Sequence, residues 1–184
     1  MIDLILAWLS KRSKTFTRNG SSNARTESAI ESGDMHPIAQ RFFNMSLSQK
    51  MQVHLALAAI ALKQWEEFAA AGSIPRKYIE TVCGTRQEVD LGLPSDALSC
   101  VLEGTDPTQI SERYLEPITA LQDDDWSLPD DPQYAFYAIY NTFRKYALGK
   151  EIDDWLIVNQ ALSSFGENSA EAESTFEKVM GEVA

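Results

Sequence analysis

The feature that most constrains the fold is residues 47–71, which contain neither glycine nor proline. Alanine and leucine, which favour helices strongly, make up nearly all of residues 55–62. Ser46 and Gln49 match a capping box at the start of this run, and Gly72 matches a C-terminal stop. A helix of this length would extend about 37 Å, enough to cross a domain. The sequence therefore predicts one long central helix, the most buried of the fold, with the other helices packed around it.

The rest of the chain carries repeated helix signals. Proline fits the first turn of a helix because its missing N–H is not needed there, and apolar residues at helical spacing follow Pro37, Pro75, Pro107 and Pro132. Asp131 is predicted to cap the last of these helices. We expect helices that begin at Pro37 and Asn168, and helices over residues 75–83, 95–103, 107–121, 132–148 and 152–165. No segment alternates polar and apolar residues as a half-buried strand would, so we predict an all-α fold, an irregular bundle of about six to eight helices.

The first 34 residues differ from the rest of the chain in composition. Residues 1–9 are apolar and precede a basic cluster, so residues 1–14 are predicted to form a short amphipathic helix. A secretory signal has the opposite order, and the apolar run is too short to span a bilayer. Residues 15–34 are rich in serine, asparagine, threonine and glycine, which predicts a flexible linker to a single helical domain over residues 35–184. Without an export signal, we expect a cytoplasmic protein.

The chain is strongly acidic, with 16 Lys+Arg against 27 Asp+Glu and a net charge of −11. This balance argues against nucleic acid as a partner, because phosphate contacts require clustered lysine and arginine. Residues 88–143 are the extreme case, with twelve acidic residues and Arg113 as the one base. Such a surface either keeps the protein soluble or binds a basic protein, since complementary charge speeds association.

Residues suited to catalysis are scarce. The histidines are His36 and His54, and the cysteines are Cys83 and Cys100. His54 lies within the long apolar helix and both cysteines have apolar neighbours, so these three are typical of structural residues. The sequence contains no G-x-S-x-G, G-x-G-x-x-G, G-x-x-x-x-G-K or H-E-x-x-H motif. We therefore expect no catalytic residue, no cofactor and no metal site, and hence no enzyme.

The most distinctive segment is an acidic loop followed by an aromatic helix. Residues 123–131 contain five aspartates around Trp126 and no base. The phenylalanines of the helix predicted over residues 132–148 share a stripe typical of a core, whereas Tyr134 lies off that stripe. An exposed aromatic ring beside carboxylates can anchor a basic partner. The acids at the start of the helix predicted over residues 152–165 add to this negative charge. They also interact favourably with the positive N-terminal end of that helix. The candidate partner-binding residues are Asp123, Asp124, Asp125, Trp126, Asp130, Tyr134, Asp153 and Asp154.

These features together resemble the small, acidic, wholly helical immunity proteins that neutralise bacterial toxins. The likeness rests on residues 123–143, DDDWSLPDDPQYAFYAIYNTF, and on EIDDW at residues 151–155. The likeness is one of general character over residues 36–165, and no family signature matches position by position. The resemblance implies a bacterial inhibitor that binds a basic toxin directly, without catalysis, through an acidic face that contains aromatic residues.

Two other functions are compatible with the sequence. A helical scaffold could dock on a membrane through residues 1–14, which the basic cluster favours and the acidic body opposes. A hydrolase could use carboxylates such as Asp123, Asp124 and Asp125 with a divalent metal ion, although the calcium-loop spacing D-x-[DN]-x-[DN]-G is absent. The lack of catalytic motifs and the acidic, aromatic segment favour the inhibitor.

Overall fold

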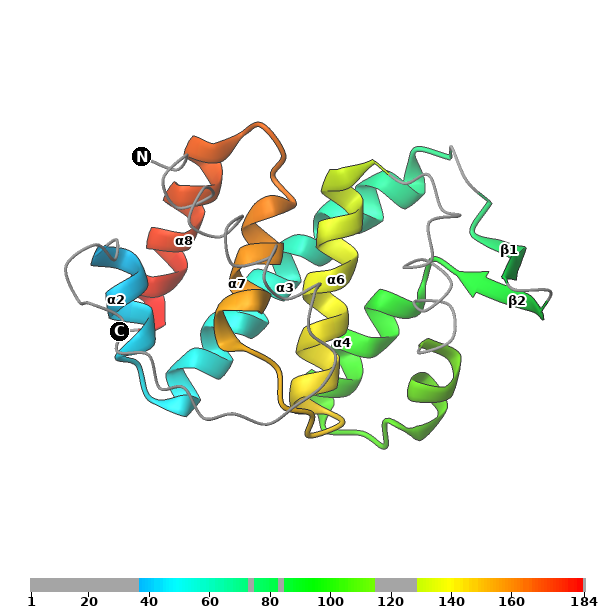
Figure 1. Cartoon of the computed structure of the whole chain (residues 1–184), viewed down its shortest axis with the longest axis horizontal. Helices are drawn as coiled ribbons and strands as arrows, with labels where there is room; N and C mark the ends of the chain where they lie inside the picture. Colours follow the sequence, from blue (N-terminus) through cyan, green and yellow to red (C-terminus); the bar gives the residue numbers. More distant parts are fainter. Residues whose placement is uncertain (1–36, 73–74, 83–84, 115–128, 184) are drawn as a thin grey trace, which may run out of the picture. The chain divides into compact units, whose positions relative to one another are not determined.

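The computed structural model describes residues 37–72, 75–82, 85–114 and 129–183 (Figure 1). The chain divides into two compact units, Met1–Ser46 and Leu47–Ala184. The helix predicted over residues 1–14 and the linker predicted over residues 15–34 lie outside the described residues.

In the first unit, helix α2 covers Pro37–Phe43 and begins at its proline, as predicted. The rings of Phe42 and Phe43 pack edge to face, with their centroids 5.8 Å apart. Beyond the helix, the backbone N–H of Met45 donates to the carbonyl of Phe42 at 3.1 Å, which closes the last turn before the second unit begins.

The second unit is a helical bundle with one small hairpin. Its elements in chain order are α3 (Leu47–Ala70), β1 (Lys77–Val82), β2 (Thr85–Asp90), α4 (Leu93–Glu103), α6 (Asp130–Tyr146), α7 (Asp154–Ser163) and α8 (Ser169–Val183). Residues 108–114 are also helical. The part of the chain that the structure describes thus has seven helices, which confirms the prediction of an irregular all-α bundle. The bounds of α4, α6 and α7 lie within two residues of the predicted ones.

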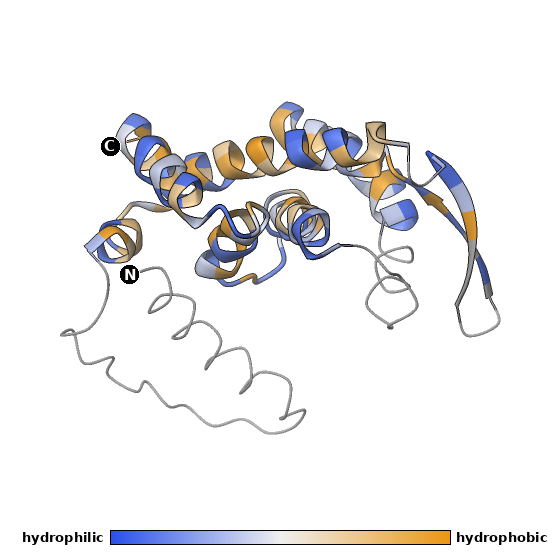
Figure 2. Cartoon of the chain, turned by 90° about the horizontal axis from the view of Figure 1, so that it is seen from above, coloured by the Kyte–Doolittle hydropathy of each residue, from blue (hydrophilic) through white to orange (hydrophobic). Residues whose placement is uncertain are grey.

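Helix α3 is the longest of the described helices and forms the centre of the bundle, where it contacts α4, α6, α7 and α8. In Figure 1, α6 and α7 lie side by side and cross α3. The view from above in Figure 2 shows these two helices end-on along the same side of α3. Helix α3 ends before Gly72, whose φ of 74° is a left-handed conformation that glycine adopts without steric cost. The predicted start after Ser46 and the predicted stop at Gly72 are therefore confirmed.

Helix α6 is more completely buried than α3, so the prediction that the long helix is the most buried was wrong. Nine of the 17 residues of α6 are buried, against six of the 24 residues of α3. The cause is aromatic packing: the Phe136 ring lies 5.0 Å from Trp65 and 5.4 Å from Tyr114 between centroids. Each such ring pair adds about 0.5–1.5 kcal/mol to the effect of area burial. The predicted core stripe of this helix is confirmed, since Phe136, Tyr140 and Phe143 are all buried.

The hairpin β1–β2 contradicts the helix predicted over residues 75–83 and the expectation of no strands. Its strands pair antiparallel, with Tyr78 opposite Val89 and Ile79 opposite Glu88. Most residues of β1 are β-branched or aromatic, and only two residues separate the strands, a length typical of hairpins. The apolar run is so short that it fits a helical or a strand period equally well. Pairing with the second strand therefore decided the local structure.

Asp90, the last residue of β2, makes three polar contacts that stabilise the end of this hairpin. Its carboxylate lies 3.0 Å from Nζ of Lys77 and 3.2 Å from Nη2 of Arg113, and it accepts the N–H of Gly92 at 2.9 Å. Burial alone would raise the pKa of Asp90, but these three contacts bring it below its usual value. Asp90 therefore has a structural role, which removes one carboxylate from the acidic surface predicted over residues 88–143.

The packing of α3 predicts a large difference between two chemically identical substitutions. Leu57 of α3 is 1% exposed, whereas Leu102 of α4 is 62% exposed. Leu57→Ala should lower the free energy of unfolding by about 2–4 kcal/mol, because it removes buried carbon atoms and leaves a cavity. Leu102→Ala should change it by less than about 0.5 kcal/mol. Chemical denaturation followed by circular dichroism measures both, and similar values for the two variants would contradict the central position of α3.

Candidate functional site

The N-terminal end of α6 carries the described part of the predicted acidic site. Asp130 and Asp131 lie in the first turn of the helix, and both are exposed. Tyr134, one turn further along, is 38% exposed although the helix as a whole is deeply buried. The remaining predicted residues of this region lie outside the described residues: Asp123, Asp124, Asp125 and Trp126.

Asp131 does not cap this helix, contrary to the prediction. Pro129 occupies the N-cap position and makes no side-chain cap, whereas Asp131 lies within the first turn, where a negative charge interacts favourably with the positive helix end. Its carboxylate lies against Gly166 in the turn between α7 and α8, and a Cβ added there would meet Oδ1 at 2.6 Å. Within the described part of the chain, neither Asp130 nor Asp131 forms an ion pair. Both carboxylates therefore present their charge to solvent beside Tyr134.

Tyr137 extends the exposed region of Tyr134 toward the core. Its side chain is half-buried, and burial raises the pKa of its hydroxyl, with a further increase from the neighbouring Tyr134 and an opposing hydrogen bond with Gln133. The Tyr137 ring packs edge to face on Phe136, with centroids 6.2 Å apart. A tyrosine held in this way loses little side-chain entropy when a partner covers it.

The last two predicted site residues, Asp153 and Asp154, lie at the start of α7, where they stabilise the fold. Asp153 is the N-cap, and its side chain accepts the backbone N–H groups of Trp155 at 2.8 Å and Leu156 at 3.2 Å. These bonds satisfy two of the N–H groups that a helix start leaves without an intrahelical partner. The negative charges of Asp153 and Asp154 thus interact favourably with the positive N-terminal end of this helix, as predicted.

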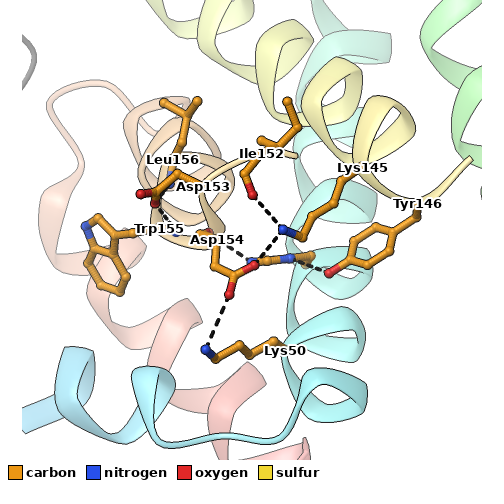
Figure 3. Close-up of polar contacts among 9 residues, drawn as sticks. Lys50, Lys145, Tyr146, Ile152, Asp153, Asp154, Trp155 and Leu156 are labelled. Carbon is orange, nitrogen blue, oxygen red and sulfur yellow. Dashed lines mark hydrogen bonds and ion pairs between the residues drawn. The ribbon is translucent and has the colours of Figure 1, made fainter. Parts of the chain in front are cut away.

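Asp154 is held between two lysines that come from different helices (Figure 3). Its Oδ2 lies 3.3 Å from Nζ of Lys50 on α3, and its Oδ1 lies 2.8 Å from Nζ of Lys145 on α6. Lys145 also donates to the carbonyl of Ile152 at 2.5 Å. Partial burial would raise the pKa of Asp154, but the two lysines hold it below its usual value. The carboxylate therefore stays charged and ties α7 to both α3 and α6.

His54 lies at the same place, buried and hydrogen-bonded through both ring nitrogens. Its Nε2 lies 2.9 Å from the carbonyl oxygen of Asp154, and its Nδ1 lies 2.7 Å from the hydroxyl of Tyr146. Because a carbonyl oxygen only accepts, Nε2 carries the proton and Nδ1 accepts the hydroxyl proton of Tyr146. Burial lowers the pKa of His54 to about 4, so the ring is neutral at pH 7, and burial also raises the pKa of Tyr146. The structural role predicted for His54 is confirmed.

We call this cluster the α3–α6–α7 junction, and it consists of Lys50, His54, Lys145, Tyr146 and Asp154. Its members interact with one another: both nitrogens of His54 have partners, and both ammonium groups contact the same carboxylate. A general base needs a nitrogen that reaches the substrate, and a nucleophilic lysine must be neutral. Among the described residues, no group of three or more His, Cys, Asp or Glu side chains is placed to hold a metal ion. The geometry of the junction therefore suits a structural tie.

The predicted site residues fall at the two opposite ends of the α6–α7 pair. Asp131 lies beside Gly166, which follows α7, whereas Lys145 lies beside Asp154 at the start of α7. The two helices therefore run antiparallel. From residue 131 to residue 145, α6 extends about 21 Å at 1.5 Å per residue. The described aspartates that the sequence grouped into one binding face thus divide between two separate places.

Four members of the junction were not among the predicted site residues: Lys50, His54, Lys145 and Tyr146. His54 and Tyr146 are 92 positions apart in the chain, and His54 and Asp154 are 100 positions apart. No local spacing could indicate such contacts. The only signal in the sequence was the pair of acids at a predicted helix start.

Comparison of the chain with known protein families, with characterised proteins and with solved structures finds no match. In the ranges that the structure describes, no helix is both long and apolar enough to cross a membrane. The geometry at the two ends of α6 is therefore the basis for a functional proposal.

The N-cap role of Asp153 predicts that stability depends on its side-chain oxygen more than on its charge. Asp153→Ala should lower the free energy of unfolding by about 1 kcal/mol, because two N–H groups lose their acceptor, whereas Asp153→Asn keeps an acceptor and should cost much less. Glu151→Ala is the control, since Glu151 is exposed and precedes the cap. Denaturation curves measure all three variants. Equal losses for alanine and asparagine at position 153 would mean that charge, and not capping, matters there.

Proposed function

We propose that this protein is a bacterial inhibitor of the immunity type, which binds a basic toxin directly and without catalysis. The proposed contact surface is the acidic–aromatic end of α6, defined as Asp130, Asp131, Tyr134 and Tyr137. One observation carries the proposal: exposed carboxylates without an ion pair among the described residues lie beside an exposed aromatic ring, on a helix that is otherwise buried.

The aromatic part of this surface supplies the short-range attraction. Burial of apolar area stabilises a complex by about 25 cal/mol per Å², and a tyrosine adds a hydroxyl that can bond a polar group of the partner. Tyr134 and Tyr137 lie on a helix whose other face is fixed in the core, and packing on Phe136 holds the Tyr137 ring in place before a partner binds. Rigid tyrosines of this kind are frequent among the residues that dominate binding energy.

The carboxylates supply the long-range attraction. The net charge of −11 draws a basic protein toward the whole chain, and exposed local charges then orient it. Asp130 and Asp131 also stabilise the start of α6 by about 0.3–1 kcal/mol each through the helix dipole. This contribution to the fold is small, so either charge can be reversed without loss of the structure.

Asp153 and Asp154 are not part of the proposed surface. Asp153 accepts two backbone N–H groups, and Asp154 is bound by two lysines. A partner that bound these carboxylates would have to displace contacts that already exist within the chain. The segment with Asp123, Asp124, Asp125 and Trp126 lies outside the described residues and directly precedes α6 in sequence, and we propose that it contributes to the same surface.

The test uses the full chain and three variants as bait for proteins of the native host, followed by kinetics with the purified partner. Asp130→Lys should slow association and reduce its dependence on salt, because a steering charge is reversed. Tyr134→Ala should raise the dissociation rate about tenfold, because an aromatic contact with the partner is lost. Glu66→Lys makes the same charge change on an exposed position of α3 and should affect both rates least.

The outcomes separate binding from inhibition. Wild-type kinetics for Asp130→Lys and Tyr134→Ala would place the interface elsewhere, and an acidic partner would contradict the proposal. If the partner is a toxin, its expression alone should stop growth and co-expression of the wild-type chain should restore it. The double variant of Asp130 and Tyr134 should restore growth less well than Glu66→Lys.

A further inference from the structure

The α3–α6–α7 junction contains a buried histidine surrounded by charges from every helix that packs on it. His54 follows Lys50 by one turn on α3, and it faces Lys145 and Tyr146 of α6 and Asp154 of α7. Among the described residues, these are the charged and titratable groups that act on the ring. With His54 neutral, two ammonium groups surround one carboxylate, so the junction carries a net charge of +1.

A second proton on His54 has to enter at Nδ1. In the neutral ring this nitrogen accepts the hydroxyl proton of Tyr146, at 2.7 Å. Protonation makes Nδ1 a donor, so the Tyr146 hydroxyl has to turn its hydrogen away and accept instead. The ring also becomes a third cation beside one carboxylate in a buried place. The carboxylate of Asp154 favours the protonated ring. Burial disfavours the protonated ring more strongly, and repulsion from both lysines adds to this effect.

The chain segment beside His54 makes polar contacts with the bundle and contains no buried side chain. Residues 147–153 connect α6 to α7, and none of them is buried. The carbonyl of Ile152 accepts from Lys145, and the carbonyl of Asp154 accepts from His54. Buried apolar side chains begin only within α7. Loss of the polar contacts would therefore open this segment first.

We propose that His54 is an acid-sensitive latch: when it takes up a proton, residues 147–154 detach from α3 and α6 while the aromatic core around α6 stays closed. The opening is local because Trp65, Phe136 and Phe143 carry no group that titrates in acid. The latch is a property of the junction and does not rest on the proposed binding function.

Hydrogen exchange measured by mass spectrometry, and corrected for the intrinsic rate, tests the latch. The closed ring has a pKa of about 4 and an exposed ring has one of 6.5, so the open state binds the proton more tightly. Linkage then favours opening about 20-fold more at about pH 5 than at about pH 7. Residues 147–154 should lose protection by this factor, whereas residues 135–143 should keep theirs. Equal protection at both pH values, or an equal loss in both segments, would overturn the proposal.

Three variants assign the effect to His54. His54→Gln keeps an N–H donor for the Asp154 carbonyl but does not titrate, so it should abolish the pH dependence of residues 147–154. Lys50→Met removes one opposing cation and so raises the pKa of the closed ring, which should make the loss of protection between about pH 7 and about pH 5 smaller than in the wild type. Lys63→Met is the control, since Lys63 is an exposed lysine of the same helix that pairs with Glu67. Wild-type pH dependence in His54→Gln would overturn the latch.

The ring itself can be observed, which keeps the proposal falsifiable even if His54→Gln does not fold. The chain has two histidines, so His36→Gln leaves the signals of His54 alone. Long-range nitrogen–proton NMR should show the proton on Nε2 at neutral pH and a midpoint near about 4. A midpoint at the ordinary value of 6.5 would mean that the ring is not held in the junction, and would overturn the proposal.

Discussion

The removal of α6 from water is the constraint on which the rest of this structure depends. Nine of its residues are buried, and it packs against α3, α4 and α7. Its Phe136 ring lies between Trp65 of α3 and Tyr114, which belongs to the helical residues 108–114. A helix enclosed to this extent has few side chains left for polar contacts except at its ends. The contacts at each end of α6 therefore determine whether its side chains stabilise the fold or can bind another molecule.

The two ends of α6 differ in this respect. At the C-terminal end, Lys145 and Tyr146 contact Asp154 and His54, and the middle of the helix is tied to α7 by a hydrogen bond at 2.8 Å from Asn141 to Gln160. At the N-terminal end, exposed aspartates and an exposed tyrosine meet solvent. Charge alone does not distinguish these places, since acids occur at both. The distinction comes from the two lysines, which neutralise one carboxylate and leave the others to the surface.

Most helices could be predicted because their signals are local. Prolines, caps and apolar spacing gave α2, α3, α4, α6 and α7 close to their observed bounds. The hairpin was missed because residues 77–82 acquire their conformation from pairing with the second strand, which a short apolar run does not reveal. The site was only partly predictable for a similar reason. The acids were found by composition, but whether Asp154 is bound within the chain depends on His54, 100 positions away, on Lys50, which is similarly remote, and on Lys145, which is near in sequence but belongs to another helix. The roles of Asp123, Asp124, Asp125 and Trp126 stay predictions.

The acids at the start of α7 hold the fold, whereas those at the start of α6 contribute little to its stability. Equilibrium unfolding of Asp154→Asn and Asp130→Asn tests this difference most directly, because both variants lose one charge at a helix start and keep a similar side-chain volume. We expect Asp154→Asn to lower the free energy of unfolding by about 2 kcal/mol, since a partly buried carboxylate shared by two lysines is lost. Asp130→Asn should lower it by only about 0.3–1 kcal/mol, the size of its interaction with the helix dipole. Equal losses, or a larger loss for Asp130→Asn, would contradict the division of roles between the two ends of α6.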